Sequence, residues 1–137
     1  MLAVDGSERA ARAATVAFEI AEMTGSQLHI IHVIPLPSVQ QFSIMTGEDI
    51  EEIKKKYSQN GRILLDGYKK AAESYGIDVE LVLDEGSPSD RIVAYANDSG
   101  MDLVIMGSRG ARSGKRIDMG SSTEQVIQGT DCPVIVV

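Results

Sequence analysis

The sequence predicts an α/β fold, a single-domain parallel sheet of five strands with helices on both faces. Short apolar runs alternate with longer segments of helical period. The predicted order is a strand followed by a helix, repeated four times, and then a fifth strand. This order is typical of parallel strands joined by right-handed crossovers. The run "DLVIMG" lacks polar alternation, as expected of a strand covered on both faces. The 137 residues, 43% of them hydrophobic, suit one domain that spans residues 1–137.

The first strand is expected in "MLAV" and the first helix over residues 8–25. Ser7 is a good N-cap and Gly25 a good helix stop. Between them, apolar side chains recur at helical spacing. The helix is therefore expected to bury one stripe, made of Ala14, Phe18 and Ala21.

A strand, a loop and a long helix are predicted in the middle of the chain. Residues 27–34, "QLHIIHVI", are rich in β-branched side chains and are followed by prolines, which end a strand. Residues 35–47 contain two prolines, a glycine and no clear period, so we expect a loop. From Glu48 to about Tyr75 the pattern is helical, with apolar positions at Ile50, Ile53, Tyr57, Leu64 and Tyr68.

The last third of the chain alternates strands and helices more tightly. Residues 78–83 are expected to form a strand, and a helix follows in which Pro88 lies in the first turn and Gly100 marks the end. Residues 102–107 form the next expected strand. A short helix over 122–129 and a final strand over 134–137 complete the predicted order.

Charge and cysteine content exclude several classes of function. The formal net charge of −7 argues against binding to nucleic acid or to anionic membranes, both of which need a basic face. No apolar run is long enough to span a membrane, and the first residues do not resemble a secretory signal. The single cysteine, Cys132, allows no intrachain disulfide and favours a reducing compartment. We therefore expect a cytoplasmic location.

The segment "GSRGARSGKRIDMGSS", residues 107–122, has the composition of a phosphate site. Glycines let the backbone approach a ligand, and Ser121, Ser122 and Thr123 begin a helix whose N-terminus attracts anions. Four basic residues lie between the outer glycines, namely Arg109, Arg112, Lys115 and Arg116. The alternative is a solvated loop whose serines only cap the helix.

Other nucleotide and metal motifs are absent. "GARSGKR" is one residue short of a P-loop, and Arg116 stands where the magnesium-binding hydroxyl belongs. No G-x-G-x-x-G follows the first strand. His29 and His32 lie three apart on a predicted strand and so point to opposite faces, which disfavours a metal site. "HIIH" also lacks the glycine of the nucleotidyltransferase "HxGH" signature.

Five segments resemble the universal stress protein family. "GSRG", nine further residues and "GSS" match the G-x-x-G-x9-G-[ST] pattern of its ATP-binding branch. "AVDGSERAARA", "LHIIHVI", "GSPSDRIVAYANDSGMDLVIMGSRG" and "CPVIVV" resemble other segments of the family in the same order. Only residues 36–75 have no familiar counterpart. "RIDM", with Arg116 and Asp118, departs from a usually more apolar segment, and a carboxylate there would repel phosphate unless it points outward or binds a cation.

The resemblance implies a Rossmann-like sheet of order 3-2-1-4-5, similar to adenine nucleotide alpha hydrolases, and an ATP site, with AMP or ADP as alternatives. It implies that Asp5 meets the ribose, that the backbone of Val33 meets adenine, and that Mg²⁺ or Mn²⁺ is held mainly by the phosphates. No catalytic residue and no protein metal ligand are assigned. Asp5 could instead cap the first helix. The predicted site comprises Ala3, Val4, Asp5, Val33, Met106, Gly107, Arg109, Gly110, Gly120, Ser121, Ser122 and Thr123.

A regulatory, stress-response role that depends on nucleotide binding is the expected function. Efficient ATP hydrolysis needs a general base and a magnesium carboxylate, and Asp5 is the only candidate. The alternatives are a slow ATP hydrolase or phosphotransferase, and a structural dimer module without nucleotide. Phe42 and Met45 could close over the base or cover the core edge.

The final strand, residues 134–137, predicts a homodimer. The resemblance places "VIVV" at the sheet edge, where an apolar strand without charge invites pairing. Two copies that pair about a two-fold axis would satisfy both edges, unless residues 36–75 fold across the strand instead.

Overall fold

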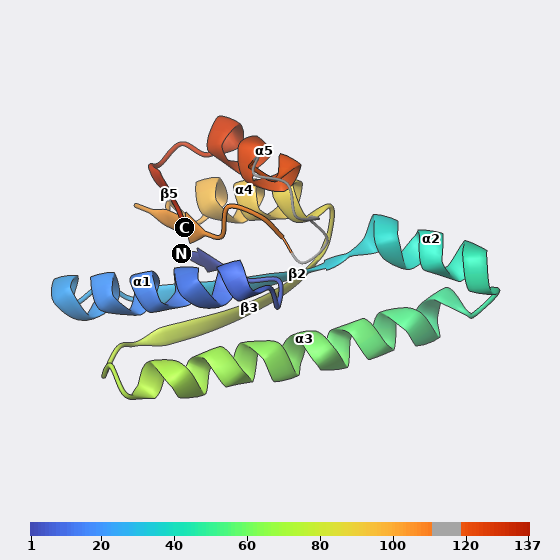
Figure 1. Cartoon of the computed structure of the whole chain (residues 1–137), viewed down its shortest axis with the longest axis horizontal. Helices are drawn as coiled ribbons and strands as arrows, with labels where there is room; N and C mark the ends of the chain where they lie inside the picture. The colour runs from blue at the N-terminus through green and yellow to red at the C-terminus, as the bar shows by residue number, and fades with distance from the viewer. Residues whose placement is uncertain (111–118) are drawn as a thin grey trace.

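The computed structural model describes residues 1–110 and 119–137 and contains a five-stranded parallel sheet of order β3-β2-β1-β4-β5 (Figure 1). Its strands are β1 (Leu2–Ala3), β2 (Leu28–Pro35), β3 (Val79–Gly86), β4 (Val104–Met106) and β5 (Val134–Val136). Its helices are α1 (Glu8–Thr24), α2 (Leu36–Thr46), α3 (Ile50–Glu73), α4 (Pro88–Asp98) and α5 (Ser121–Gly129). The predicted fold class and strand order are confirmed.

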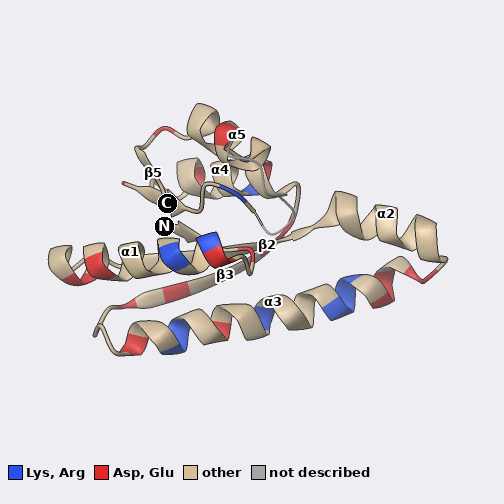
Figure 2. Ribbon diagram, viewed as in Figure 1, with Lys and Arg blue, Asp and Glu red and all other residues tan. Residues whose placement is uncertain are grey.

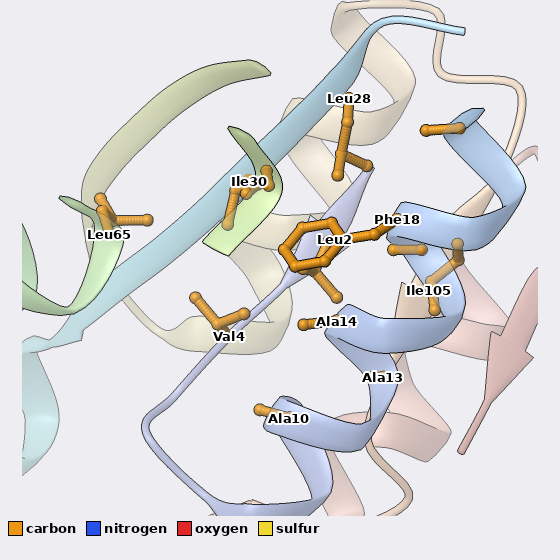
Figure 3. Packing of buried hydrophobic residues seen from close by; sticks show 13 residues of the cluster. Leu2, Val4, Ala10, Ala13, Ala14, Phe18, Leu28, Ile30, Leu65 and Ile105 are labelled. Atoms are coloured by element: carbon orange, nitrogen blue, oxygen red, sulfur yellow. The ribbon is translucent and has the colours of Figure 1, made fainter. Parts of the chain in front are cut away.

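Two helices cover each face of the sheet. Figure 1 shows α1 and α3 on one side and α4 and α5 on the other. On the first side, Phe18 lies over Leu2 and Ile30 at the centre of the sheet (Figure 3). The predicted stripe of α1 is confirmed, because Ala14, Phe18 and Ala21 are all buried. A second cluster fills the α4–α5 side, with Ala3, Ile31, Val33, Ile92, Ala96, Val104, Met106 and Val126 among its members.

The central strand β1 is the shortest of the sheet, and it pairs with partners far apart in the chain. Leu2 is opposite Ile30 on β2 and opposite Ile105 on β4. β1 therefore joins the two halves of the sheet, and all strands end in the same direction. The carboxyl ends of β1, β2 and β4 consequently lie side by side.

The ends of α1 follow the predicted signals. The Ser7 hydroxyl accepts a hydrogen bond from the Ala10 amide at 3.1 Å, which caps the helix start. Gly25 has φ 67°, a left-handed conformation that costs a residue without Cβ little, and its amide bonds the Ala21 carbonyl.

The predicted loop over residues 35–47 is wrong, because most of it forms α2. Pro37 lies in the first turn, where a helix amide has no partner to lose, so the proline starts the helix rather than breaking it. Gly47, at φ 71°, ends the helix by bonding the Ser43 carbonyl. No period was visible because Val39 is the one buried residue of α2, while Phe42, Ile44 and Met45 are exposed.

The long helix α3 agrees with its prediction and packs closely on the sheet at Gly61. Asp49 caps its start, and the predicted apolar positions face the core. A Cβ added to Gly61 would lie 2.9 Å from His32 Cδ2 and 2.9 Å from Leu83 Cδ1. Gly61 thus lets α3 approach β2 and β3.

Gly61→Ala is expected to leave the protein about 1–3 kcal/mol less stable than Gly67→Ala, because the new methyl group overpacks the helix–sheet contact. Gly67 lies on the exposed side of the same helix with nothing near its missing Cβ, so both variants gain the same helix propensity. Urea unfolding of the two variants measures the difference. Equal stabilities would show that α3 can move away from the sheet without cost.

Most basic residues of the described chain lie on α1 and α3, together with acidic residues. Figure 2 shows Lys and Arg along α1 and α3, interleaved with Asp and Glu. Within residues 1–110 and 119–137, no helix has the length and apolar character needed to cross a membrane.

Candidate nucleotide site

A cavity of about 800 Å³ opens at the carboxyl ends of the central strands. Parallel sheets bind ligands at this end, where the strand order reverses between β1 and its neighbours. All twelve residues of the predicted site line this cavity, although they come from four separate segments of the chain. The fold therefore brings these twelve residues together around one cavity.

The turn after β1 presents Asp5 at the mouth of the cavity. Gly6 has φ 82°, a conformation that favours glycine, and it turns the chain from β1 into α1. The Asp5 Oδ1 atom accepts the Ser7 amide at 3.0 Å. Since Ser7 itself caps α1, Asp5 stabilises the preceding turn and is not the helix cap.

The backbone of Val33 faces the cavity beyond the last residue of β1. The Val4 amide donates to the Ile31 carbonyl at 2.9 Å, so residue 31 points its backbone groups toward β1. Alternate residues of a strand turn their amide and carbonyl to the same neighbour. Val33 therefore directs one donor and one acceptor to the side of β1, past the point where β1 ends.

The segment after β4 passes close to α1 and to Asp5. A Cβ on Gly107 would lie 2.8 Å from Arg9 Cβ and 3.1 Å from the Ala10 amide nitrogen. A Cβ on Gly110 would lie 2.8 Å from Asp5 Oδ2. Gly107 is thus required for the close approach to α1, whereas Gly110 lies close to a side chain that can move, and neither has a positive φ.

The start of α5 closes the other end of the cavity. Gly120 is its N-cap, without a side-chain cap, and its φ of −67° is open to any residue. The Gly120 amide donates to the Ser108 carbonyl at 2.8 Å, and the buried Thr123 hydroxyl donates to the Gly107 carbonyl at 3.1 Å. Ser121 and Ser122 lie exposed in the first turn, so the alternative in which they cap the helix is wrong.

The sequence analysis missed the wall that α2, α3 and α4 contribute. From α3 the cavity is lined by Tyr57, Asn60, Gly61 and Leu64. Tyr57 and Leu64 were predicted only as apolar core positions of the helix, and nothing in the sequence pointed to Asn60 or Gly61. The remaining lining residues are Ala10, Ile31, His32, Pro35, Pro37, Ser38, Pro88 and Ile92.

The two histidines point to opposite faces of the sheet, as predicted. His29 Nδ1 lies 2.7 Å from the Tyr95 hydroxyl of α4. His32 Nδ1 donates to the Val4 carbonyl at 2.8 Å, since a carbonyl can only accept, and its ring packs against Gly61 of α3. His32 therefore fixes the end of β1 that leads into Asp5.

Charge at the cavity comes from Asp5 and Arg109 among the described residues. Burial raises the pKa of Tyr68, and the Asp5 carboxylate raises it further, so this phenol stays neutral. No group of three or more metal-binding side chains gathers within residues 1–110 and 119–137. Arg112, Lys115, Arg116 and Asp118 lie outside the described residues.

Phe42 and Met45 neither cover the core nor line this cavity. They line a smaller neighbouring hollow of about 250 Å³ together with Ser38, Gln41 and Tyr57. Their exposed fractions are 44% and 77%. Of the two alternatives, the one in which they cover the core edge is therefore wrong, and the one in which they close over a base stays a prediction.

The chain is similar in sequence and in fold to known universal stress proteins. The universal stress protein YxiE of Bacillus subtilis is 31% identical over 143 residues, covering 100% of this chain and 96% of that protein. The solved structure of MJ0577 from Methanocaldococcus jannaschii superposes with TM-score 0.88 at 30% identity, covering 99% of this chain and 92% of that one.

Two more distant solved structures share the fold. One is a universal stress protein in complex with cAMP, with TM-score 0.68, 22% identity and coverage of 99% and 92%. The other is a family member from Arabidopsis thaliana with AMP bound, with TM-score 0.68, 19% identity and coverage of 100% and 88%. Residues 1–137 match the Universal stress protein family as a whole, and the chain therefore belongs to that family.

Proposed function

We propose that this universal stress protein binds an adenine nucleotide, with ATP as the main ligand, in the 800 Å³ cavity. The observation that carries the proposal is the convergence of the turn after β1, the end of β2, the segment after β4 and the start of α5 on one cavity. Two proteins of the same fold hold cAMP and AMP, which supports the ligand class.

The ligand would lie across the cavity with its base near β2 and its phosphates near α5. The backbone donor and acceptor of Val33 suit the edge of adenine, and Asp5 suits the ribose hydroxyls. The amides in the first turn of α5, for which the described residues provide no side-chain cap, and the charge of Arg109 suit the phosphates. Mg²⁺ or Mn²⁺ would be held by the phosphates, and binding would neutralise part of their charge.

Binding with little turnover fits this arrangement better than efficient catalysis. Asp5 is the one carboxylate among the described cavity residues, and its turn places it beside Gly110 rather than at the start of α5. The function is therefore regulatory, in a stress response, with slow hydrolysis or phosphotransfer as the rival activity. Release of phosphate over hours by the purified protein would favour the rival.

Calorimetric titration tests the proposed function. ATP with Mg²⁺ should bind with a dissociation constant in the micromolar range or tighter, and denatured protein should release nucleotide that mass spectrometry identifies. If millimolar ATP produced no heat of binding and no thermal shift, the proposal would be contradicted. The protein would then be a structural module without nucleotide.

Asp5→Ala is expected to weaken ATP binding by about 1–3 kcal/mol, because ribose hydroxyls lose a charged acceptor. The preference for ATP over 2′,3′-dideoxy-ATP should fall with it. The ratio of the two affinities does not respond to a loosening of the turn at Ser7, because such a loosening weakens the binding of both nucleotides alike. Asp5→Asn, which keeps the Oδ1 acceptor for Ser7, serves as the control. An unchanged ratio in both variants would limit Asp5 to the turn.

We also propose a homodimer through β5. Both β3 and β5 are edge strands, but β3 carries Glu80, Asp84 and Glu85, whereas β5 carries no charge. Charged side chains protect an edge from pairing, so β5 is the open one. Antiparallel pairing of two copies would cover it.

Val136→Lys is expected to convert this dimer into monomers or aggregates, because a charge is placed on the paired edge. Sedimentation velocity at tens of micromolar compares the variant with the wild type. Ile127→Lys is the control, since Ile127 is exposed on α5 and outside the edge. A monomeric wild type would contradict the proposal, and a dimer that survives Val136→Lys would move the interface elsewhere.

A further inference from the structure

Helix α3 presents one side-chain amide to the cavity, that of Asn60. Its neighbours at helical spacing are Tyr57, Gly61 and Leu64, which also line the cavity. Gly61 is buried and Tyr57 and Leu64 are half-buried, whereas Asn60 is exposed beside them. Asn60 therefore borders the cavity without packing in the core.

The amide of Asn60 has no hydrogen-bond partner in the part of the chain that the structure describes. It does not support α3 either, because asparagine is a weaker helix former than alanine or leucine. Its donor and acceptor are thus available to a molecule in the cavity.

Gly61 brings this amide to the end of β2. The close approach of Gly61 to the His32 ring sets the backbone of α3 against the strand, one residue before Val33. Val33 is where the proposed base lies. Asn60 therefore lies on the α3 side of the base, and the Val33 backbone lies on the β1 side.

We propose that Asn60 selects adenine over 6-oxo purines in this site, an inference that rests on the proposed nucleotide-binding function. Adenine offers a donor at N6 beside a ring acceptor on both of its hydrogen-bonding edges. An amide matches such an edge with two hydrogen bonds. If the Val33 backbone takes the N1 edge of the base, Asn60 faces the N7 edge. On that edge hypoxanthine and guanine carry two acceptors, O6 and N7, which one amide cannot match with its one donor and one acceptor.

The other polar side chains of this wall do not discriminate in the same way. Ser38 and Tyr57 carry hydroxyl groups, which rotate to donate or to accept. An amide accepts only through its oxygen and donates only through its nitrogen, so in either orientation two hydrogen bonds require one donor and one acceptor on the base. The selectivity of this wall consequently depends on Asn60.

The test compares ATP with ITP, which differs at position 6 and N1 of the base, in calorimetric titrations of three proteins. These are the wild type, Asn60→Ala and Gln59→Ala, the last being the exposed neighbour of Asn60 that does not line the cavity. Alanine leaves room for either base and favours the helix, so both variants should melt at or above the wild-type temperature.

Asn60→Ala is expected to lower the preference for ATP over ITP about tenfold, through weaker ATP binding with nearly unchanged ITP binding. Gln59→Ala should keep the wild-type preference. If the wild type binds ATP and Asn60→Ala keeps the wild-type ratio of ATP to ITP affinity, the role of Asn60 is overturned. The proposed function is not affected by that result. A wild-type protein that binds neither nucleotide would overturn the proposed function itself.

Discussion

Gly107→Val is expected to lower the free energy of unfolding by about 3 kcal/mol, the upper end of the usual cost of overpacking. The added Cβ alone would lie 2.8 Å from Arg9 Cβ and 3.0 Å from the Arg9 carbonyl carbon. These atoms belong to the first turn of α1, whose backbone is held by the Ser7 cap. The overlap with Arg9 can therefore be relieved only by a shift of β4 or of α1, and both elements pack in the core.

Urea unfolding measures the loss, and Gly110→Ala provides the control. Among the described residues its Cβ would meet the Asp5 carboxylate, an exposed side chain that can turn away. Gly110→Ala should change stability by less than about 0.5 kcal/mol, yet weaken ATP binding by displacing Asp5. A Gly107→Val protein as stable as the wild type would show that the α1–β4 contact is loose in solution.

Thr123→Val is expected to cost about 1–3 kcal/mol of stability, because it keeps the volume of the side chain but leaves the Gly107 carbonyl without its donor. Thr123 is 2% exposed, so water does not replace the lost hydroxyl. The same bond ties the start of α5 to the end of β4. Loss of ATP affinity should accompany the loss of stability, because the two ends of the phosphate segment separate.

Two further variants separate these effects. Thr123→Ser restores the donor and should recover ATP affinity, although it loses a buried methyl group. Ser122→Ala removes an exposed hydroxyl and should weaken ATP binding while leaving unfolding in urea unchanged. A Thr123→Val protein with wild-type stability and affinity would show that the hydrogen bond to Gly107 is dispensable.

The sheet was predictable because its strands obey strong local rules. β2 and β4 are apolar runs bounded by polar or turn residues, and Ser7 and Gly25 mark α1 on both sides. α2 was not predictable by the same rules. Its proline and glycine are turn signals that here start and end a helix, and its exposed apolar side chains show no buried face.

The site was predictable where it depends on glycine, and not where it depends on packing. Gly107 and Gly110 are conspicuous in the sequence because few other residues allow such close approach. Gly120 is different, since its backbone angles suit any residue and only a nearby ligand would require glycine. Asn60 gave no signal at all. Its importance depends on the distance between α3 and β2, which the close contact at Gly61 sets.

The pairing of Leu2 with Ile105 has a consequence for the growing chain on the ribosome. β1 is made first, but its partner β4 emerges only when most of the chain has been synthesised, on the order of ten seconds later at usual elongation rates. During that interval Ala3, Ile31 and Val33 lack their sheet neighbours Val104 and Met106 and the Val126 side chain of α5, which belong to the same buried cluster in the finished fold. The nascent protein therefore carries an uncovered apolar sheet face, and its yield should depend on how fast translation reaches β4 and on how well that face is shielded until then.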